Sequence, residues 1–90
     1  MEYIEAVNPY NGRPLEKYRI FSDSDIKSVL EKAELAFDSW KIESVEHRSG
    51  LLKKLAKTLL KNKKSYAELM TREMGKPINQ GIAEIEKCAW

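Results

Sequence analysis

The sequence predicts a mainly α-helical segment that begins with a β-hairpin. Two runs rich in β-forming residues lie on either side of a dense turn signal within residues 1–21. Over residues 22–90, apolar side chains recur at steps of three and four in four successive stretches, which is the period of an amphipathic helix. No further strand pattern follows, so we expect the hairpin to lie against a helix or a sheet, because an isolated hairpin is marginal in water.

The hairpin is predicted from its two strands and its turn. Residues 3–7 alternate weakly between apolar and polar side chains, and residues 15–21 form the second strand candidate. Between them, the sequence Asn-Pro-Tyr-Asn-Gly ends in Asn11-Gly12, a pair that tolerates the positive φ angles of a tight hairpin turn. We therefore predict two antiparallel strands joined at this pair.

The first two helices are predicted from their caps and apolar stripes. Ser22 or Ser24 is expected to cap the first helix, and the aspartates beside them lie where the helix dipole favours negative charge. The inward stripe of this helix ends at Phe37 and Trp40, which we interpret as core residues. Ser44 is expected to cap the second helix. Its predicted apolar face consists of Leu51, Leu52, Leu55, Ala56, Leu59 and Leu60.

The third and fourth helices are predicted from their ends. The third is expected from about Lys64 to Met74, and Gly75 suits the left-handed position that terminates a helix. Pro77 suits the first turn of the fourth helix, where its missing N–H is harmless. The apolar pattern of the fourth helix reaches Trp90 without a stop signal, so we expect this helix to be cut off at the C-terminus.

Composition narrows the classes of function. A net charge of +2 over 90 residues is too small to imply a nucleic-acid partner. The single cysteine and single histidine exclude an intrachain disulfide and a cysteine-based zinc site. No apolar run approaches the roughly 18 residues of a membrane span, and the acidic N-terminus is unlike a secretory signal. We therefore expect a cytoplasmic protein with no membrane partner.

Four motifs, in order along the chain, resemble the aldehyde dehydrogenase family. They are the hairpin sequence at 8–12, the helix end Ala-Phe-Asp-Ser-Trp at 36–40, the helix start at 47–56, and Glu-Met-Gly-Lys-Pro at 73–77 followed by Glu84. The resemblance covers nearly the whole chain. The Met-Gly-Lys-Pro form looks most like the succinate-semialdehyde dehydrogenase branch of the family.

The resemblance implies an α/β parent protein with a Rossmann-like cofactor domain. Residues 1–90 would form the N-terminal part of that domain, with the hairpin at 1–21 and four helices at 22–90. Members of the family oxidise an aldehyde to a carboxylic acid with NAD or NADP. The first candidate for the aldehyde is succinate semialdehyde. A cysteine thiolate attacks the aldehyde and a glutamate activates water. The implied partners are the remainder of the polypeptide and further copies in a homo-oligomer.

The segment itself is predicted to hold no catalytic, cofactor-binding or metal-binding residue. Its glycines are too scattered for a loop that cradles a dinucleotide. They are Gly12, Gly50, Gly75 and Gly81. We interpret Cys88 as a small, half-buried helix residue and His47 as a surface residue. The resemblance places the family's cofactor loop and catalytic residues beyond this region. NAD or NADP is therefore expected to bind the complete enzyme and not this fragment, which is expected to be inactive alone.

Two hypotheses concern charged residues. The lysine face is expected to be solvated, and the alternative function is a small helical binding module that uses it to contact an anionic partner. This face consists of Lys53, Lys54, Lys57, Lys61, Lys63 and Lys64. Glu84 and Lys87 share one helix face by their spacing of three. The resemblance places that helix beside the substrate entrance, where Lys87 would meet an anionic substrate tail.

Overall fold

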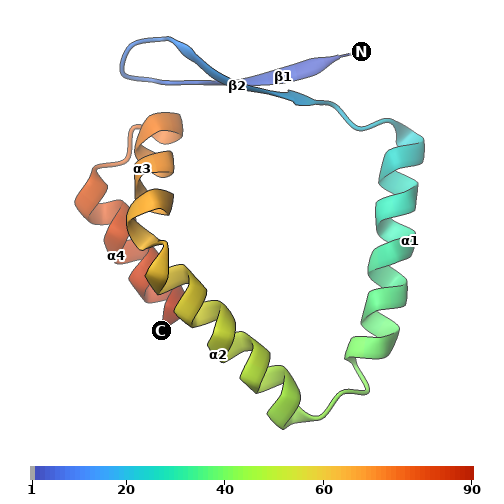
Figure 1. Cartoon of the computed structure of the whole chain (residues 1–90). Helices are drawn as coiled ribbons and strands as arrows, with labels where there is room; N and C mark the ends of the chain where they lie inside the picture. Colours follow the sequence, from blue (N-terminus) through green and yellow to red (C-terminus); the bar gives the residue numbers. More distant parts are fainter. Residues whose placement is uncertain (1) are drawn as a thin grey trace.

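A hairpin and four helices form an open ring in the computed structural model, which describes residues 2–90 (Figure 1). The elements are β1 (Tyr3–Val7), β2 (Pro14–Arg19), α1 (Asp23–Trp40), α2 (Val45–Lys61), α3 (Lys63–Met74) and α4 (Ile78–Ala89). The hairpin forms one side of the ring, α1 and α2 form two more, and α3 with α4 closes it beneath the hairpin loop (Figure 1). The predicted element order is confirmed.

The hairpin loop is wider than predicted. The N–H of Asn8 donates to the carbonyl of Arg13 at 2.9 Å, and the N–H of Gly12 donates to the carbonyl of Asn8 at 2.8 Å. Gly12 has a φ of 69°, whereas Asn11 does not have a positive φ, so the expected tight turn at Asn11-Gly12 is wrong. The physical reason lies in the two asparagine side chains, which accept backbone N–H groups of Tyr10 and Arg13 and hold the wider loop.

A capping network joins β2 to α1. The hydroxyl of Ser22 accepts the N–H of Asp25 at 3.2 Å, and the Asp25 carboxylate accepts the N–H of Ser22 at 2.9 Å. The guanidinium of Arg19 lies 3.1 Å from the same carboxylate. The backbone hydrogen bond from Ser22 lowers the pKa of Asp25, and the Ser22 hydroxyl and Arg19 act in the same direction. Ser22, of the two predicted candidates, is therefore the cap.

The remaining helix ends follow the predicted signals closely. The hydroxyl of Ser44 accepts the N–H of His47 at 3.0 Å and caps α2. Gly75 ends α3 with a φ of 73°, as predicted. Pro77 lies immediately before α4 and not within its first turn. The hydroxyl of Thr71 reaches the carbonyl of Lys76 at 2.6 Å and so stabilises the turn between α3 and α4.

Packing is concentrated where α3 meets α4. Ala67 on α3 is fully buried, and Ile85 on α4 is 7% exposed. Gly81 is buried at the same contact, and a Cβ added to it would lie 3.0 Å from the Cβ of Ala67. α2 also packs against α4, and the hairpin contacts α3. Among residues 2–90, α1 takes part in none of these packed pairs.

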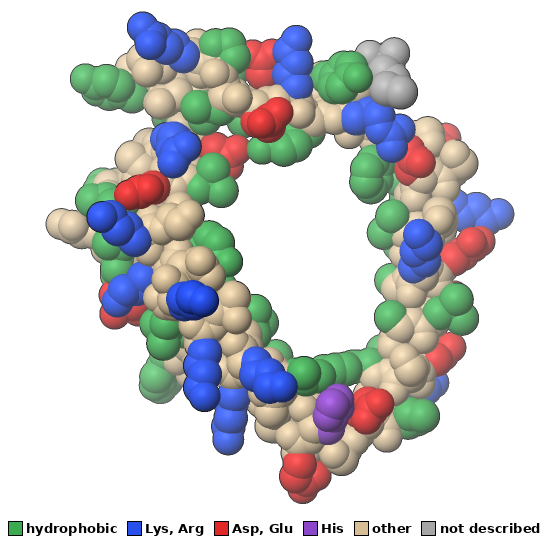
Figure 2. Space-filling model, viewed as in Figure 1, with side chains coloured by type: hydrophobic (Ala, Val, Ile, Leu, Met, Phe, Trp, Pro, Cys, Tyr) green, Lys and Arg blue, Asp and Glu red, His purple; other side chains and the backbone are tan. Residues whose placement is uncertain are grey.

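The molecule is a thin frame and not a closed globule. Its radius of gyration is 17.4 Å, whereas a compact chain of this length has a value of about 12 Å. It extends 48 × 37 × 13 Å and exposes 7,781 Å² of surface. A compact protein of 10.4 kDa exposes about 5,400 Å². The space-filling view shows an opening through the ring with apolar side chains along its rim (Figure 2).

The predicted helix stripes exist, but most of them are not buried. Phe37 is 59% exposed and Trp40 is 38% exposed, so their assignment to the core is wrong. On α2, Leu52 and Leu55 are 61% and 52% exposed. The periodicity of these stripes is a local property of each helix, whereas burial needs a partner surface, and α1 takes part in none of the packed pairs described above.

Candidate functional surface

An apolar hollow lies where α1 turns into α2. We call it the elbow hollow, and it has a volume of about 780 Å³. It forms because the turn after Trp40 is short and tied down at both ends. The N–H of Glu43 donates to the carbonyl of Trp40 at 3.1 Å, and Ser44 caps the next helix. The hollow is lined by Ala33, Ala36, Phe37, Ser39, Trp40, Glu43, His47 and Leu51.

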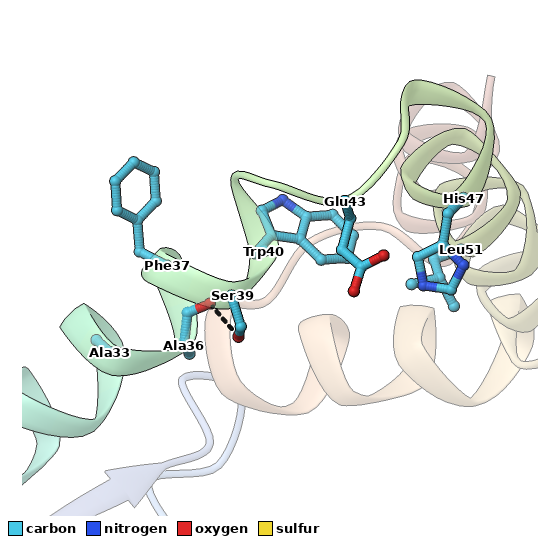
Figure 3. A pocket seen from close by; sticks show the side chains of 8 residues that line it. All are labelled: Ala33, Ala36, Phe37, Ser39, Trp40, Glu43, His47 and Leu51. Atoms are coloured by element: carbon cyan, nitrogen blue, oxygen red, sulfur yellow. Dashed lines mark hydrogen bonds between the residues drawn. The ribbon is translucent and has the colours of Figure 1, made fainter.

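The side chains of the elbow hollow are mostly apolar (Figure 3). The Trp40 ring lies between the α1 residues and two polar groups, Glu43 of the connecting turn and His47 of α2 (Figure 3). The hydroxyl of Ser39 donates to the carbonyl of Ala36 at 3.1 Å, so its proton already takes part in a hydrogen bond with the backbone. No thiol or free hydroxyl lines the hollow. Its chemistry suits the binding of apolar side chains and not a bond-making reaction.

The predicted site residues lie apart from one another. His47 is exposed, as predicted, and it lies in the elbow hollow. Cys88 lies in the last turn of α4 and is exposed, so its predicted partial burial is wrong, since that face of α4 has no covering element within residues 2–90. Residues 2–90 contain no group of three or more histidine, cysteine, aspartate or glutamate side chains arranged to hold a metal ion.

Glu84 has its partner on the turn before α4 and not on its own helix. Its carboxylate forms an ion pair with the ammonium group of Lys76, although Lys87 lies only three residues away. Lys87 is exposed. The lysine face lies along α2 and α3, and Figure 2 shows basic side chains gathered over these helices. One of its members, Lys63, lies 3.9 Å from the carboxylate of Glu86.

The chain does not fit a dinucleotide cofactor. A pyrophosphate needs backbone N–H groups in a glycine-rich turn between a strand and a helix. Here the one strand-to-helix connection, from β2 to α1, contains no glycine. Neither Gly50 nor Gly81 lies in a turn, because each lies within a helix. No step of nicotinamide chemistry can therefore be assigned to residues 2–90.

The sequence profile of the aldehyde dehydrogenase family matches residues 1–90. The chain belongs to this family. It is 34% identical over 84 residues to the NAD(P)+ succinate semialdehyde dehydrogenase Sad of Escherichia coli (strain K12), which is 93% of this chain and 18% of that protein. A probable NADP+ succinate-semialdehyde dehydrogenase of Synechocystis sp. (strain PCC 6803) is 35% identical over 86 residues, covering 96% of this chain and 19% of that protein.

A solved structure gives the same answer for the fold. The crystal structure of succinic semialdehyde dehydrogenase from Streptococcus pyogenes in complex with NADP+ superposes with a TM-score of 0.87 at 31% identity. The match covers 98% of this chain and 19% of that one. The predicted family, its succinate-semialdehyde branch and the predicted fold class are confirmed. The chain spans about a fifth of the length of these relatives. Neither the family nor these relatives support the alternative of a lysine-rich binding module.

Two of the family motifs meet in the structure. Pro9, in the hairpin motif, lies against Gly75, in the Glu-Met-Gly-Lys-Pro motif, and its Cγ would be 3.2 Å from a Cβ added to this glycine. The ion pair of Lys76 with Glu84 joins the second motif to the glutamate that follows it. These motifs of the aldehyde dehydrogenase family therefore have structural roles in this chain, because they fix the hairpin loop, α3 and α4 around one turn.

Proposed function

We propose that this chain is the N-terminal structural unit of an NAD(P)-dependent aldehyde dehydrogenase that oxidises succinate semialdehyde to succinate. The observation that carries the proposal is the family match over residues 1–90, together with relatives of that activity at 34% and 35% identity. In this reaction the aldehyde loses a hydride to the nicotinamide and gains the oxygen of a water molecule. The proposal includes that the complete enzyme is cytoplasmic and forms a homo-oligomer.

The proposed role of residues 1–90 is structural: they contact the rest of the enzyme and supply no reacting group. Their single thiol, Cys88, lies in the last turn of α4, and it has no histidine or glutamate partner within residues 2–90. The exposed surface exceeds that of a compact chain by about 2,400 Å². Much of it is apolar side chain on α1, α2 and the hairpin. Such a surface suits contact with a larger body that supplies the thiolate, the general base and the cofactor loop.

The chain alone is expected to show no reduction of NAD+ or NADP+ with succinate semialdehyde. A chimera of the Escherichia coli relative, in which residues 1–90 replace the matched segment, is expected to retain the activity. Absorbance at 340 nm measures the reduction of NAD+ or NADP+ by the chain alone and by the chimera. The purified chain must first be freed of host dehydrogenases. Turnover by the chain alone contradicts its structural role, whereas a folded but inactive chimera contradicts the proposed function.

Lys87 is proposed to attract the carboxylate tail of the substrate. It is the basic residue of the last turn of α4, and its ammonium group has no acidic partner among residues 2–90. In the active chimera, Lys87→Met is expected to raise the KM for succinate semialdehyde about tenfold, the value of one charge-assisted hydrogen bond, with kcat little changed. Butanal, which lacks the carboxylate, is the matched control substrate. Equal effects on both substrates, or none on either, would remove this role.

A further inference from the structure

We propose that Lys76 is a positioning residue for substrate selectivity, because its ion pair with Glu84 keeps the ammonium group of Lys87 free to attract an anionic substrate. This role rests on the proposed function and deepens it, since it names the residue on which the substrate contact of Lys87 depends. Lys76 and Glu84 need not touch the substrate themselves, because they act through Lys87.

Glu84 has the right spacing to neutralise Lys87. Side chains three or four residues apart on a helix are neighbours, and a glutamate that precedes a lysine at this spacing readily pairs with it. Glu84 precedes Lys87 by three residues on α4, and the position four residues before Lys87 holds Ala83. A lysine that is already paired with one carboxylate attracts a second one less, because the two charges of the pair largely cancel.

The structure gives Glu84 a different partner. The ammonium group of Lys76, in the turn between α3 and α4, forms an ion pair with Oε2 of the Glu84 carboxylate. Lys87 is exposed, and none of the ion pairs among residues 2–90 includes it. The side chain of Lys76 is 30% exposed, so water screens its charge less than the charge of an exposed lysine. The carboxylate therefore pairs across the turn and leaves Lys87 without a partner.

The backbone on both sides of the Lys76 side chain is held in place. The hydroxyl of Thr71 donates to the carbonyl of Lys76 at 2.6 Å, and Pro77 follows with a φ of −56° that its ring fixes. The side chain of Lys76 therefore starts from a fixed point beside α4, and less backbone freedom is lost when it meets Glu84. A pair of Glu84 with Lys87 would instead join two exposed side chains of one helix, which is a weak interaction.

The test is Lys76→Met in the active chimera. This change frees Glu84 to pair with Lys87, so the KM for succinate semialdehyde is expected to rise about twofold, the strength of an exposed pair at this spacing, with kcat little changed. The KM for butanal, which has no carboxylate, is expected to stay the same. Glu84→Gln added to Lys76→Met is expected to restore the KM for succinate semialdehyde, because the amide carries no charge. Glu84→Gln alone is expected to leave it unchanged.

Lys63→Met is the matched control. Lys63 also reaches from α3 to α4, where its ammonium group lies 3.9 Å from the carboxylate of Glu86. Its removal frees a carboxylate directly before Lys87 in the sequence, but side chains at i and i+1 of a helix do not face each other. The KM values for both substrates are therefore expected to stay the same.

The outcomes separate the role of Lys76 from the proposed function. If Lys87→Met raises the KM for succinate semialdehyde but Lys76→Met does not, the role of Lys76 is overturned and the proposed function stands. An equal rise for both substrates, or a rise that Glu84→Gln does not reverse, also overturns this role. A folded but inactive chimera overturns the proposed function.

A measurement on the chain of residues 1–90 decides the pairing without enzyme activity. The side-chain NMR signals of Lys87 are expected to move on Lys76→Met, to return when Glu84→Gln is added, and to stay in place on Lys63→Met. If Lys76→Met leaves these signals unchanged, Lys76 does not keep Glu84 away from Lys87, and the proposed positioning role is wrong.

Discussion

Gly81→Val is expected to destabilise the α3–α4 contact by about 3 kcal/mol. Gly81 is buried, and a Cβ at this position would lie 3.0 Å from the Cβ of Ala67 and 3.2 Å from its Cα. Neither of these atoms belongs to a flexible side chain, so the helices must move apart to admit two further methyl groups. Separation would also expose Ile85, which is 7% exposed in the structure. Denaturant unfolding monitored by circular dichroism measures the effect, and the variant is expected to lose its helix signal at a lower denaturant concentration than the unaltered chain.

Gly50→Val is the matched control for Gly81→Val. Gly50 is also a glycine within a helix, but nothing lies within 4 Å of the position of its Cβ. Valine has a better helix propensity than glycine by a few tenths of a kcal/mol, so this variant is expected to be neutral or slightly stabilising. If both variants lose the same stability, the cause is not the close approach of α3 and α4, and the importance assigned to this contact is wrong.

The features predicted correctly from the sequence are those whose physical cause lies within a few residues. Ser22 and Ser44 cap helices because their hydroxyls accept an N–H three residues later. Gly75 ends α3 because glycine alone adopts a positive φ without strain. The strand at residues 3–7 and the four amphipathic stripes belong to the same class. Each of these signals can be read without knowledge of any distant part of the chain.

The features that were missed depend on contacts between distant residues or on their absence. Phe37 lies on a helix stripe of the expected period, yet it is 59% exposed, because α1 takes part in none of the extensively packed pairs of residues 2–90. The elbow hollow depends on the angle between α1 and α2, which no local pattern specifies. Glu84 was considered with Lys87 on its own helix, but its carboxylate pairs with Lys76, across the turn that precedes α4. Sequence spacing identifies neighbours within one helix, whereas the partner of Glu84 lies outside its helix.

Gly75→Ala is expected to weaken the attachment of the hairpin to α3 and to destabilise the chain by about 2 kcal/mol. One part of this loss is the left-handed backbone, since a φ of 73° disfavours any residue with a Cβ by about 1 kcal/mol. The other part is contact, because the new Cβ would lie 3.2 Å from the Cγ of Pro9. This side of the ring has few other contacts, so displacement of the loop at Pro9 would loosen the whole hairpin.

Gly12→Ala and Pro9→Ala separate these two causes. Gly12 has a φ of 69° with nothing within 4 Å of its Cβ position, so its replacement is expected to show the backbone effect alone, about 1 kcal/mol. In a Pro9→Ala background the Cγ is gone, and Gly75→Ala should then have the same effect as Gly12→Ala. Chemical denaturation of the unaltered chain, Pro9→Ala, Gly75→Ala and the double variant gives the coupling free energy between Pro9 and Gly75. A coupling of zero would mean that the meeting of the two family motifs contributes nothing to stability, and that Gly75 serves the backbone of the turn alone.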